Sequence, residues 1–375
     1  MPNYIQLTPG DPAPWFKQRS FANPRFTFDT VAGRYLVLCF YASAGHAHAQ
    51  AAIQAVRSRP ELFDDTLASF FGVSLDAHDE SEHRVANHVP GYRYFWDFDG
   101  TVSRLYGALP READAAPGKE AVYRMWVVLD PTLRVLRVIP FRADQGDIGE
   151  VLAYLDSLAP AARFAGFDLQ APVLVLPNVF EPAFCRTLIG LYETHGGTDS
   201  GFMRDLGGQT HLMHDPVHKR RKDCVIDDAG VIQQIQTRFT RRVVPEILKA
   251  YQFKVAYMER YIVSCYASED AAHFRPHRDN TTQATAHRRF AASVNLNEDF
   301  DGGEVSFPEY GSRSFKAPAG GTVVFSCSLL HAVSTVTRGR RFAFLPFLYD
   351  EAAAQVLEAN ANCLARDDGN ETEYR

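Results

Sequence analysis

The sequence lacks the features that mark membrane, secreted and nucleic-acid-binding proteins. It has no uninterrupted run of 18 apolar residues, whereas a helix needs about 20 to cross a bilayer, so we expect no membrane span. Its first residues do not place a basic segment before an apolar one, so we expect no signal peptide. Lysine and arginine number 39 against 45 aspartates and glutamates, and the net charge of −6 argues against a general nucleic-acid binder.

Cysteine is sparse as well. The six cysteines are scattered and none belongs to a CxxC pair, which indicates free thiols in a reducing cytoplasm. Internal repeats and low-complexity segments are also missing. The 375 residues are enough for two domains or for one large domain.

Residues 1–160 show strands alternating with helices. The apolar run 35–41 predicts a strand buried on both faces, and residues 47–57 predict the helix that follows it. Further elements are expected as strands over 69–75, 123–131 and 134–139 and as a helix over 145–158. This alternation indicates an α/β layer fold.

The same part of the chain resembles a peroxiredoxin of the thioredoxin superfamily. The likeness lies in the short stretches 10–14, 40–41, 72–76, 97–100 and 106–107. By this resemblance Arg124 occupies the place of the family's active-site arginine, and Ala49 that of the peroxidatic cysteine. Peroxide chemistry needs a thiolate, which alanine cannot supply, so we expect a domain without peroxidase activity that serves docking, dimerisation or stability.

Three other residues of this domain could carry chemistry. Cys39 lies within the predicted buried strand, and we interpret it as an inert core thiol. His46 and His48 are interpreted as an ordinary exposed loop pair, with metal binding as the alternative.

Residues 161–170 are expected to form a linker to the second domain. Beyond it the pattern predicts a strand over 171–180, a helix over 181–193 and one or two helices over 231–251. The basic stretch 218–223 is interpreted as a solvated loop. The alternative is a basic rim that steers an anionic substrate into a pocket.

The stretch from 253 to 350 predicts short antiparallel strands separated by glycine turns, which is typical of a double-sheet jelly roll. The expected strands cover 258–266, 289–297 and 322–326, a strand that carries residues 277 and 279, and a strand that carries residue 341. Alternate residues of a strand share a face, so Arg341 and Ala343 should point one way and Phe342 and Phe344 the other.

Three residues form a candidate metal site. His277 and Asp279 point to one face of a strand, and His331 follows 52 positions after Asp279, far enough to come from another strand. Two imidazoles and one carboxylate leave three positions of a metal open, which is the facial arrangement of non-haem Fe(II) enzymes that activate O₂. A similar stretch at 78–80 has no distal histidine at a matching spacing, so no metal is expected there.

Arg341 lies ten residues after His331 and completes a pattern that resembles the 2-oxoglutarate/Fe(II) dioxygenases of the prolyl-4-hydroxylase-like branch. The resemblance covers about residues 170–350 and includes the Gly302-Gly303 turn. It implies a double-stranded β-helix, Fe(II) held by the triad, and 2-oxoglutarate and O₂ as cosubstrates. It further implies that Arg341 clamps the distal carboxylate of 2-oxoglutarate and that Tyr266 is a second contact to it.

The sequence therefore predicts a thioredoxin-like domain over 1–160, a linker over 161–170, a jelly-roll dioxygenase over 171–350, and a C-terminal helix and tail over 351–375. The predicted enzyme hydroxylates an unactivated C–H bond of an amino-acid side chain, a peptidyl side chain or a small metabolite, and releases succinate. A thiol peroxidase and a non-catalytic metal-binding adaptor remain as alternatives.

Partners and substrate contacts are predicted more coarsely. Arg278, Asn280 and Arg289 are candidate substrate contacts, with structural salt bridges as the alternative for each. We expect a small-molecule or peptide substrate, neither nucleic acid nor membrane as a partner, and a candidate homodimer surface on the N-terminal domain.

Overall fold

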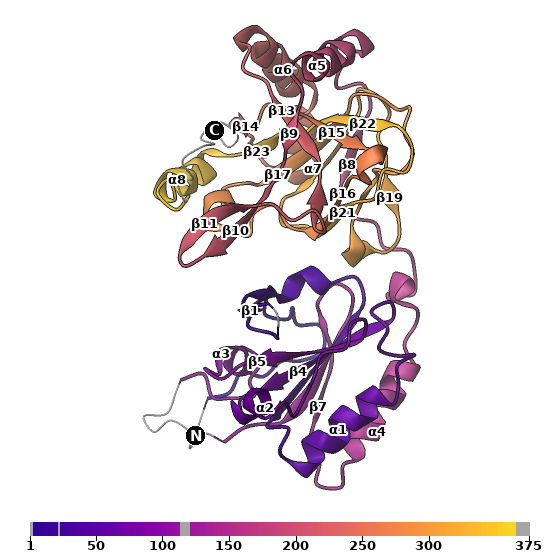
Figure 1. The fold of residues 1–375 in the computed structure, drawn as a ribbon, viewed down its shortest axis with the longest axis vertical. Coiled ribbons are helices and arrows are strands. Elements are labelled where there is room, and N and C mark those ends of the chain that lie inside the picture. Colours follow the sequence, from indigo (N-terminus) through magenta and orange to yellow (C-terminus); the bar gives the residue numbers. More distant parts are fainter. Residues whose placement is uncertain (1–2, 22, 113–120, 365–375) are drawn as a thin grey trace. The chain divides into compact units, whose positions relative to one another are not determined.

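The computed structural model describes residues 3–21, 23–112 and 121–364, and the chain divides into two compact units. One comprises Met1–Gln170 with Pro308–Ser312, and the other comprises Ala171–Phe307 with Arg313–Arg375 (Figure 1). Within the described ranges no helix is both long enough and apolar enough to cross a membrane.

The first unit is built on a five-stranded sheet in the order β5-β4-β3-β6-β7. Its strands are β3 (Tyr35–Ala42), β4 (Ala68–Ser74), β5 (Tyr92–Trp96), β6 (Met125–Leu129) and β7 (Val135–Pro140). The first three run parallel, and β6 and β7 are antiparallel to their neighbours. The predicted strands and the α/β class are therefore confirmed.

Helices α1 (Ala47–Arg57) and α4 (Gly146–Asp156) pack on one face of this sheet (Figure 1). They contribute Ala49, Ile53, Val151 and Leu155 to a core shared with the strands. The other face carries a cluster of stacked and edge-on rings, which includes Phe16, Phe28, Phe71, Phe95 and Tyr106. The smaller elements are β1 (Lys17–Gln18), β2 (Phe26–Thr27), η1 (Phe28–Val31), α2 (His78–Ser81), α3 (Thr101–Leu105) and η2 (Ala161–Arg163).

The second unit contains two main sheets. The larger runs β14-β23-β17-β22-β15-β13-β9, and β20 and β8 join it through β17. Its strands are β8 (Leu174–Leu176), β9 (Thr198–Asp199), β13 (Lys222–Val225), β14 (Tyr257–Glu259), β15 (Ile262–Ala267), β17 (Phe290–Asn295), β20 (Thr322–Ser326), β22 (Arg340–Phe344) and β23 (Phe347–Tyr349). The smaller sheet runs β12-β16-β21-β18-β19 and comprises β12 (Lys219–Arg220), β16 (His273–His277), β18 (Val305–Ser306), β19 (Ser314–Phe315) and β21 (His331–Val333).

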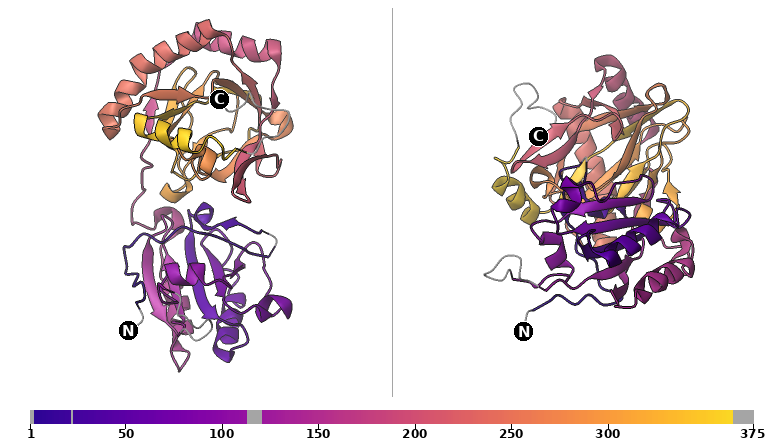
Figure 2. Two further views of the ribbon diagram at one scale, coloured as in Figure 1. Left: turned by 90° about the vertical axis from the view of Figure 1, so that its left-hand side faces the viewer. Right: turned by 60° about the horizontal axis from the view of Figure 1, so that its bottom comes forward.

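Helices α5 (Pro182–His195), α6 (Ala229–Arg242) and α7 (Val244–Tyr251) cover the outer face of the larger sheet (Figure 2). Their apolar residues Leu188, Ile235 and Ile247 share a core with Phe342 and Phe344 of β22. A separate hairpin pairs β10 (Phe202–Leu206) with β11 (Gln209–Met213). The remaining elements of this unit are η3 (Ser268–Asp270), η4 (Gln283–Thr285) and α8 (Glu351–Ala359), whereas η5 (Pro308–Tyr310) belongs to the first unit.

Two local predictions are wrong. The single strand expected over 258–266 is broken between β14 and β15, because Arg260 takes a left-handed conformation with φ of 72°. The basic stretch 218–223 is not a solvated loop, since β12 and β13 occupy most of it and Lys219, Arg221 and Asp223 are buried.

Candidate active site

His277 and His331 meet across two antiparallel strands of the smaller sheet. They lie directly opposite each other in the pairing of β16 with β21, and their ring centroids are 4.2 Å apart. Asp279 completes the group, with its Oδ1 3.5 Å from Nε2 of His277 and its Oδ2 3.4 Å from Nε2 of His331. One ligand atom from each residue lies within 4.8 Å of the other two, which is compact enough to hold one metal ion.

The predicted reason for the position of Asp279 is wrong. We expected His277 and Asp279 to share a strand face, but β16 ends at His277 and Asp279 lies in the turn that follows. The backbone N–H of Asp279 donates to the carbonyl of Cys327 at 2.9 Å. This bond fixes the turn beside the segment that leads to His331.

Both imidazoles are oriented by backbone carbonyls. Nδ1 of His277 lies 2.8 Å from the carbonyl of Arg275, and Nδ1 of His331 lies 3.0 Å from that of Leu329. Because a carbonyl only accepts, each Nδ1 carries a proton, and each Nε2 faces Asp279.

Protonation also suits metal binding. Burial and the neighbouring His331 lower the pKa of His277 to about 4. Burial alone would raise the pKa of Asp279, but the two imidazoles outweigh burial and hold that pKa below its usual value. At neutral pH the site therefore offers a neutral His277 and an ionised Asp279, which are the forms that bind a metal.

Arg341 lies on β22, in the larger sheet, and only 1% of it is exposed. Its Nε donates to Oδ1 of Asn295 at 2.9 Å, and its Nη2 donates to Oγ of Ser293 at 2.6 Å. Its Nη1 is buried and has no hydrogen-bond partner among the residues that the structure describes. Burial lowers the pKa of Arg341, but a guanidinium starts so high that it keeps its charge at neutral pH.

The Gly302-Gly303 turn makes room for this guanidinium. Gly303 has φ of 70°, and a Cβ there would lie 2.9 Å from Cδ of Arg341. Any larger residue at 303 would press on the arginine and would be strained in this conformation.

Arg341 and the triad line a single cavity between the two sheets. Tyr266 lines it too and lies opposite Arg341 in the pairing of β15 with β22. The remaining wall is largely apolar and includes Phe274, Val305, Phe325, Val333 and Phe347. Arg340 points away, is exposed, and pairs with Glu269 at 3.1 Å.

None of the three candidate substrate contacts lines this cavity. Nη1 of Arg278 donates to the carbonyl of Ser328, and Nδ2 of Asn280 donates to Oγ of the same serine at 2.8 Å. Nη1 of Arg289 donates to the carbonyl of Ala286 at 2.7 Å. All three therefore take part in local contacts beside the site.

Sequence reasoning missed a buried charged network on the cavity wall. Nη2 of Arg221 donates to Oδ2 of Asp223 at 2.7 Å, and Oγ of Ser264 donates to Oδ1 of Asp223 at 2.6 Å. Lys219 belongs to the same network through Oγ of Ser200 at 2.7 Å. The sequence did contain a signal, since charged residues stand at every second position, at Lys219, Arg221 and Asp223. This spacing places their side chains on one side of an extended chain, and all three are buried.

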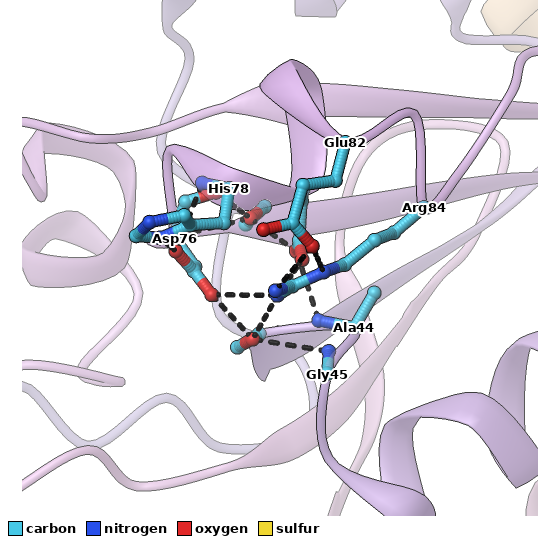
Figure 3. A network of polar contacts seen from close by, with 9 residues as sticks. Ala44, Gly45, Asp76, His78, Glu82 and Arg84 are labelled. Carbon is cyan, nitrogen blue, oxygen red and sulfur yellow. Dashed lines mark hydrogen bonds and ion pairs between the residues drawn. The ribbon is translucent and has the colours of Figure 1, made fainter.

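The turn before α1 in the first unit is held by acidic side chains (Figure 3). Oδ2 of the buried Asp79 accepts from the backbone N–H of Ala44 at 2.8 Å, and Arg84 pairs with Asp76 at 3.0 Å and with Asp79 at 3.2 Å. Nδ1 of His78 lies 2.9 Å from Asp76. The 78–80 stretch thus serves this network, and no described residue joins it in a metal-sized cluster.

The residues that the peroxiredoxin resemblance singled out carry no exposed thiol. Ala49 is buried on α1, and Cys39 is buried on β3, where burial raises its pKa well above the usual value. Cζ of Arg124 lies 5.6 Å from the ring centroid of Phe141.

His48 corrects the interpretation of an exposed loop pair. It lies on α1, its side chain is 11% exposed, and its Nε2 is 3.0 Å from Oδ1 of the buried Asp147. His46 precedes the helix and is exposed.

Comparison with known proteins agrees with this two-part architecture. Residues 9–138 match the AhpC/TSA family, and residues 261–349 match the 2OG-Fe(II) oxygenase superfamily. The chain thus joins a thioredoxin-like domain of the AhpC/TSA type to a 2OG-Fe(II) oxygenase domain.

The curated relatives match only part of the chain. A PKHD-type hydroxylase of Synechococcus sp. is 32% identical over 89 residues, which are 22% of this chain and 39% of that protein. One from Cupriavidus metallidurans is 41% identical over 80 residues, which are 19% of this chain and 35% of that protein. The chain therefore spans well under half the length of these relatives.

Two solved structures resemble parts of the chain. A prolyl hydroxylase from Trichoplax adhaerens, in complex with a hypoxia inducible factor peptide fragment, is 14% identical with a TM-score of 0.40, over 50% of this chain and 87% of that chain. Peroxidoxin BcpB from Mycobacterium tuberculosis is 22% identical with a TM-score of 0.35, over 41% of this chain and 99% of that chain.

The oxygenase family implies Fe(II) and 2-oxoglutarate, and the residues present fit both. Two imidazoles with their Nε2 lone pairs directed at one carboxylate suit Fe(II). The unpartnered Nη1 of Arg341 suits a carboxylate of 2-oxoglutarate.

Proposed function

We propose that the protein is an Fe(II)- and 2-oxoglutarate-dependent dioxygenase that hydroxylates an unactivated C–H bond. Its substrate would be an amino-acid side chain, a peptidyl side chain or a small metabolite. The observation that carries this proposal is the buried Arg341 in the same cavity as the triad, because its Nη1 has no hydrogen-bond partner in the described part of the chain. Burying a cation costs free energy unless an anion pairs with it. 2-Oxoglutarate has a carboxylate at each end of its carbon chain, so one could pair with Arg341.

Different residues would bind the metal and the cosubstrate. His277, Asp279 and His331 would hold Fe(II) on one face and leave the other positions open. Arg341 would bind the distal carboxylate, held in place by Asn295 and Ser293. Bound Fe(II) would supply the oxidising chemistry, in which 2-oxoglutarate, O₂ and the substrate C–H give succinate, CO₂ and the hydroxylated substrate.

The cavity wall would keep bulk water from the open positions of the metal. The Phe274 ring stacks on the His277 ring with centroids 3.5 Å apart, and the Phe325 ring packs at a tilt against the His331 ring with centroids 4.6 Å apart. Rings packed this closely hold the imidazoles in one orientation. They also lower the local dielectric, which strengthens the pairing of Arg341 with a carboxylate.

Neither alternative function gains support from a particular residue. A thiol peroxidase needs an accessible thiolate, and Cys39 is buried with a raised pKa. A function as a non-catalytic metal-binding adaptor would not require the buried Arg341 to line the same cavity as the triad. For the N-terminal domain we propose docking, dimerisation or stability.

The test measures succinate formed by the full chain. The protein is mixed anaerobically with Fe(II) and 2-oxoglutarate, then given O₂ with or without proline-containing peptides, free amino acids, carrier-bound amino acids or other metabolites. We expect a slow basal rate that at least one substrate class accelerates. A rate no higher than that of the metal-free protein, with every substrate and without 2-oxoglutarate binding, would contradict the proposal.

A further inference from the structure

Arg221 lies at the junction between the two sheets, directly between β12 of the smaller sheet and β13 of the larger one. Its side chain is only 4% exposed and lines the cavity. Its Nη1 donates to Oη of Tyr266 at 3.2 Å, and its Nη2 donates to Asp223 at 2.7 Å and to Ser200 at 3.1 Å. Arg221 thus connects a buried carboxylate to the tyrosine that faces Arg341.

The hydrogen-bond roles are fixed by chemistry. A guanidinium has donors and no acceptor, so the Tyr266 hydroxyl must be the acceptor in its bond with Arg221. The proton of that hydroxyl is then available to another acceptor. Among the residues that the structure describes, no hydrogen bond donated by the Tyr266 hydroxyl is found.

The other cation near this tyrosine cannot accept the proton either. Cζ of Arg341 lies 5.2 Å from the Tyr266 ring centroid, and Cζ of Arg221 lies 5.6 Å from it. With two guanidinium groups beside one phenol, the acceptor that suits the remaining proton is an anion in the cavity. The Tyr266 hydroxyl is therefore oriented to donate a hydrogen bond to a carboxylate in the cavity.

Asp223 fixes the direction of Arg221. It lies opposite Ser264 in the pairing of β13 with β15, and Oγ of Ser264 donates to its Oδ1 at 2.6 Å. Ser264 and Tyr266 are two residues apart on β15 and therefore point to the same side of the sheet. The carboxylate, the guanidinium and the phenol form one connected chain that leads into the cavity.

We propose that Arg221 is a positioning residue. By donating to the Tyr266 hydroxyl, it orients that hydroxyl so that the tyrosine donates its own proton to a carboxylate of bound 2-oxoglutarate. This inference rests on the proposed function, because it assumes that 2-oxoglutarate occupies the cavity. It goes beyond the spacing pattern, in which position 221 has no role.

A double-mutant cycle on 2-oxoglutarate affinity tests the inference. The full chain with Fe(II) is titrated anaerobically with 2-oxoglutarate, and the absorption of the complex gives Kd for the wild type, Arg221→Gln, Tyr266→Phe and the double variant. Loss of one hydrogen bond to a charged group should raise Kd about 10- to 100-fold in each single variant. In the double variant Kd should match that of Tyr266→Phe within about twofold, because Arg221 acts through the tyrosine.

Arg220→Gln is the matched control, because Arg220 is the exposed neighbour and bonds only to backbone carbonyls of Pro216 and Asp270 in the contacts found. Its Kd should equal that of the wild type. Should Arg221→Gln fail to fold, Arg221→Lys replaces it in the cycle, because it keeps a cation for Asp223 but loses the fork.

The outcomes separate the two proposals. Additive effects of the two single substitutions, or an unchanged Kd in Arg221→Gln, would overturn the positioning role while leaving the dioxygenase intact. A wild-type protein that binds no 2-oxoglutarate would instead contradict the proposed function.

Discussion

In the proposed function, the binding of 2-oxoglutarate depends most on the guanidinium of Arg341. It donates to the neutral side chains of Asn295 and Ser293, and its Nη1 has no hydrogen-bond partner within residues 3–21, 23–112 and 121–364. Neither of these two hydrogen-bond partners carries a charge that would neutralise the guanidinium. The ligand that completes the site must therefore bring an anion to it.

Replacing Arg341 by alanine should weaken 2-oxoglutarate binding strongly. A desolvated carboxylate left without its partner costs about 2–5 kcal/mol, which corresponds to a roughly 30- to 3000-fold rise in Kd. Arg341→Lys should lose less, since the charge remains while the fork is lost. Arg340→Ala serves as the control, because Arg340 is exposed and pairs with Glu269. A damaging Arg340→Ala with a mild Arg341→Ala would show that the inward face of β22 is misassigned.

Single residues were predictable where chain spacing carried the information. His277, Asp279, His331 and Arg341 stand at distances along the chain that indicate their roles, and the structure brings all four to one cavity. Arg221, Ser293 and Asn295 have no such spacing. Their part in the site arises from strand pairing, which brings together residues more than 40 positions apart.

At the level of elements, β22 illustrates how one strand serves both binding and stability. Arg341 and Ala343 face the cavity side, whereas Phe342 and Phe344 pack in the core under the helices. Phe344 is fully buried, and its ring lies 5.8 Å from those of Phe180 and Phe239. The strand that presents the clamp is thus held by the helical layer behind it.

Phe344→Ala should therefore destabilise the second unit by about 3–5 kcal/mol, through lost burial and the cavity left behind. The measurement is the unfolding free energy from chemical denaturation of the full chain. Phe167→Ala is the matched control, because Phe167 is 60% exposed and its loss should change stability by no more than about 0.5 kcal/mol. A loss below about 1 kcal/mol for Phe344→Ala would mean that the helices do not hold β22.

Elements differed in how far they could be predicted. The apolar run of β3 and the following α1 agree closely with the expected ranges, because local pattern alone decides them. The break between β14 and β15 could not be read from an alternating pattern, since it depends on Arg260 turning toward Asp223, 3.1 Å away. Likewise, the buried charges of 219–223 become favourable only when the network around Asp223 is assembled.

For the whole molecule, the two units differ in what their sites offer. The second unit assembles a metal triad and a buried cation in one cavity. In the first unit, a polar network that includes Asp76 holds the turn before α1 (Figure 3). The buried Cys39 of this unit has a raised pKa. The chemistry is therefore expected in the second unit alone.

The full chain should show no reduction of hydroperoxides with thiol reductants. Peroxide reduction requires an accessible thiolate, and burial keeps Cys39 protonated. Cys39→Ser should accordingly change nothing in a hydroperoxide consumption assay. Robust peroxidase activity that disappears in Cys39→Ser would reverse this reading of the first unit.

The most direct test is anaerobic binding of Fe(II) and 2-oxoglutarate by the triad variants. The wild type should bind one equivalent of Fe(II) and develop a visible absorption band when 2-oxoglutarate is added. His277→Ala, Asp279→Ala and His331→Ala should each lose the band while remaining folded, because the site needs all three ligands. His78→Ala should behave like the wild type, since its imidazole pairs with Asp76 in the other unit. Full iron and 2-oxoglutarate binding by Asp279→Ala would contradict the assignment of this site.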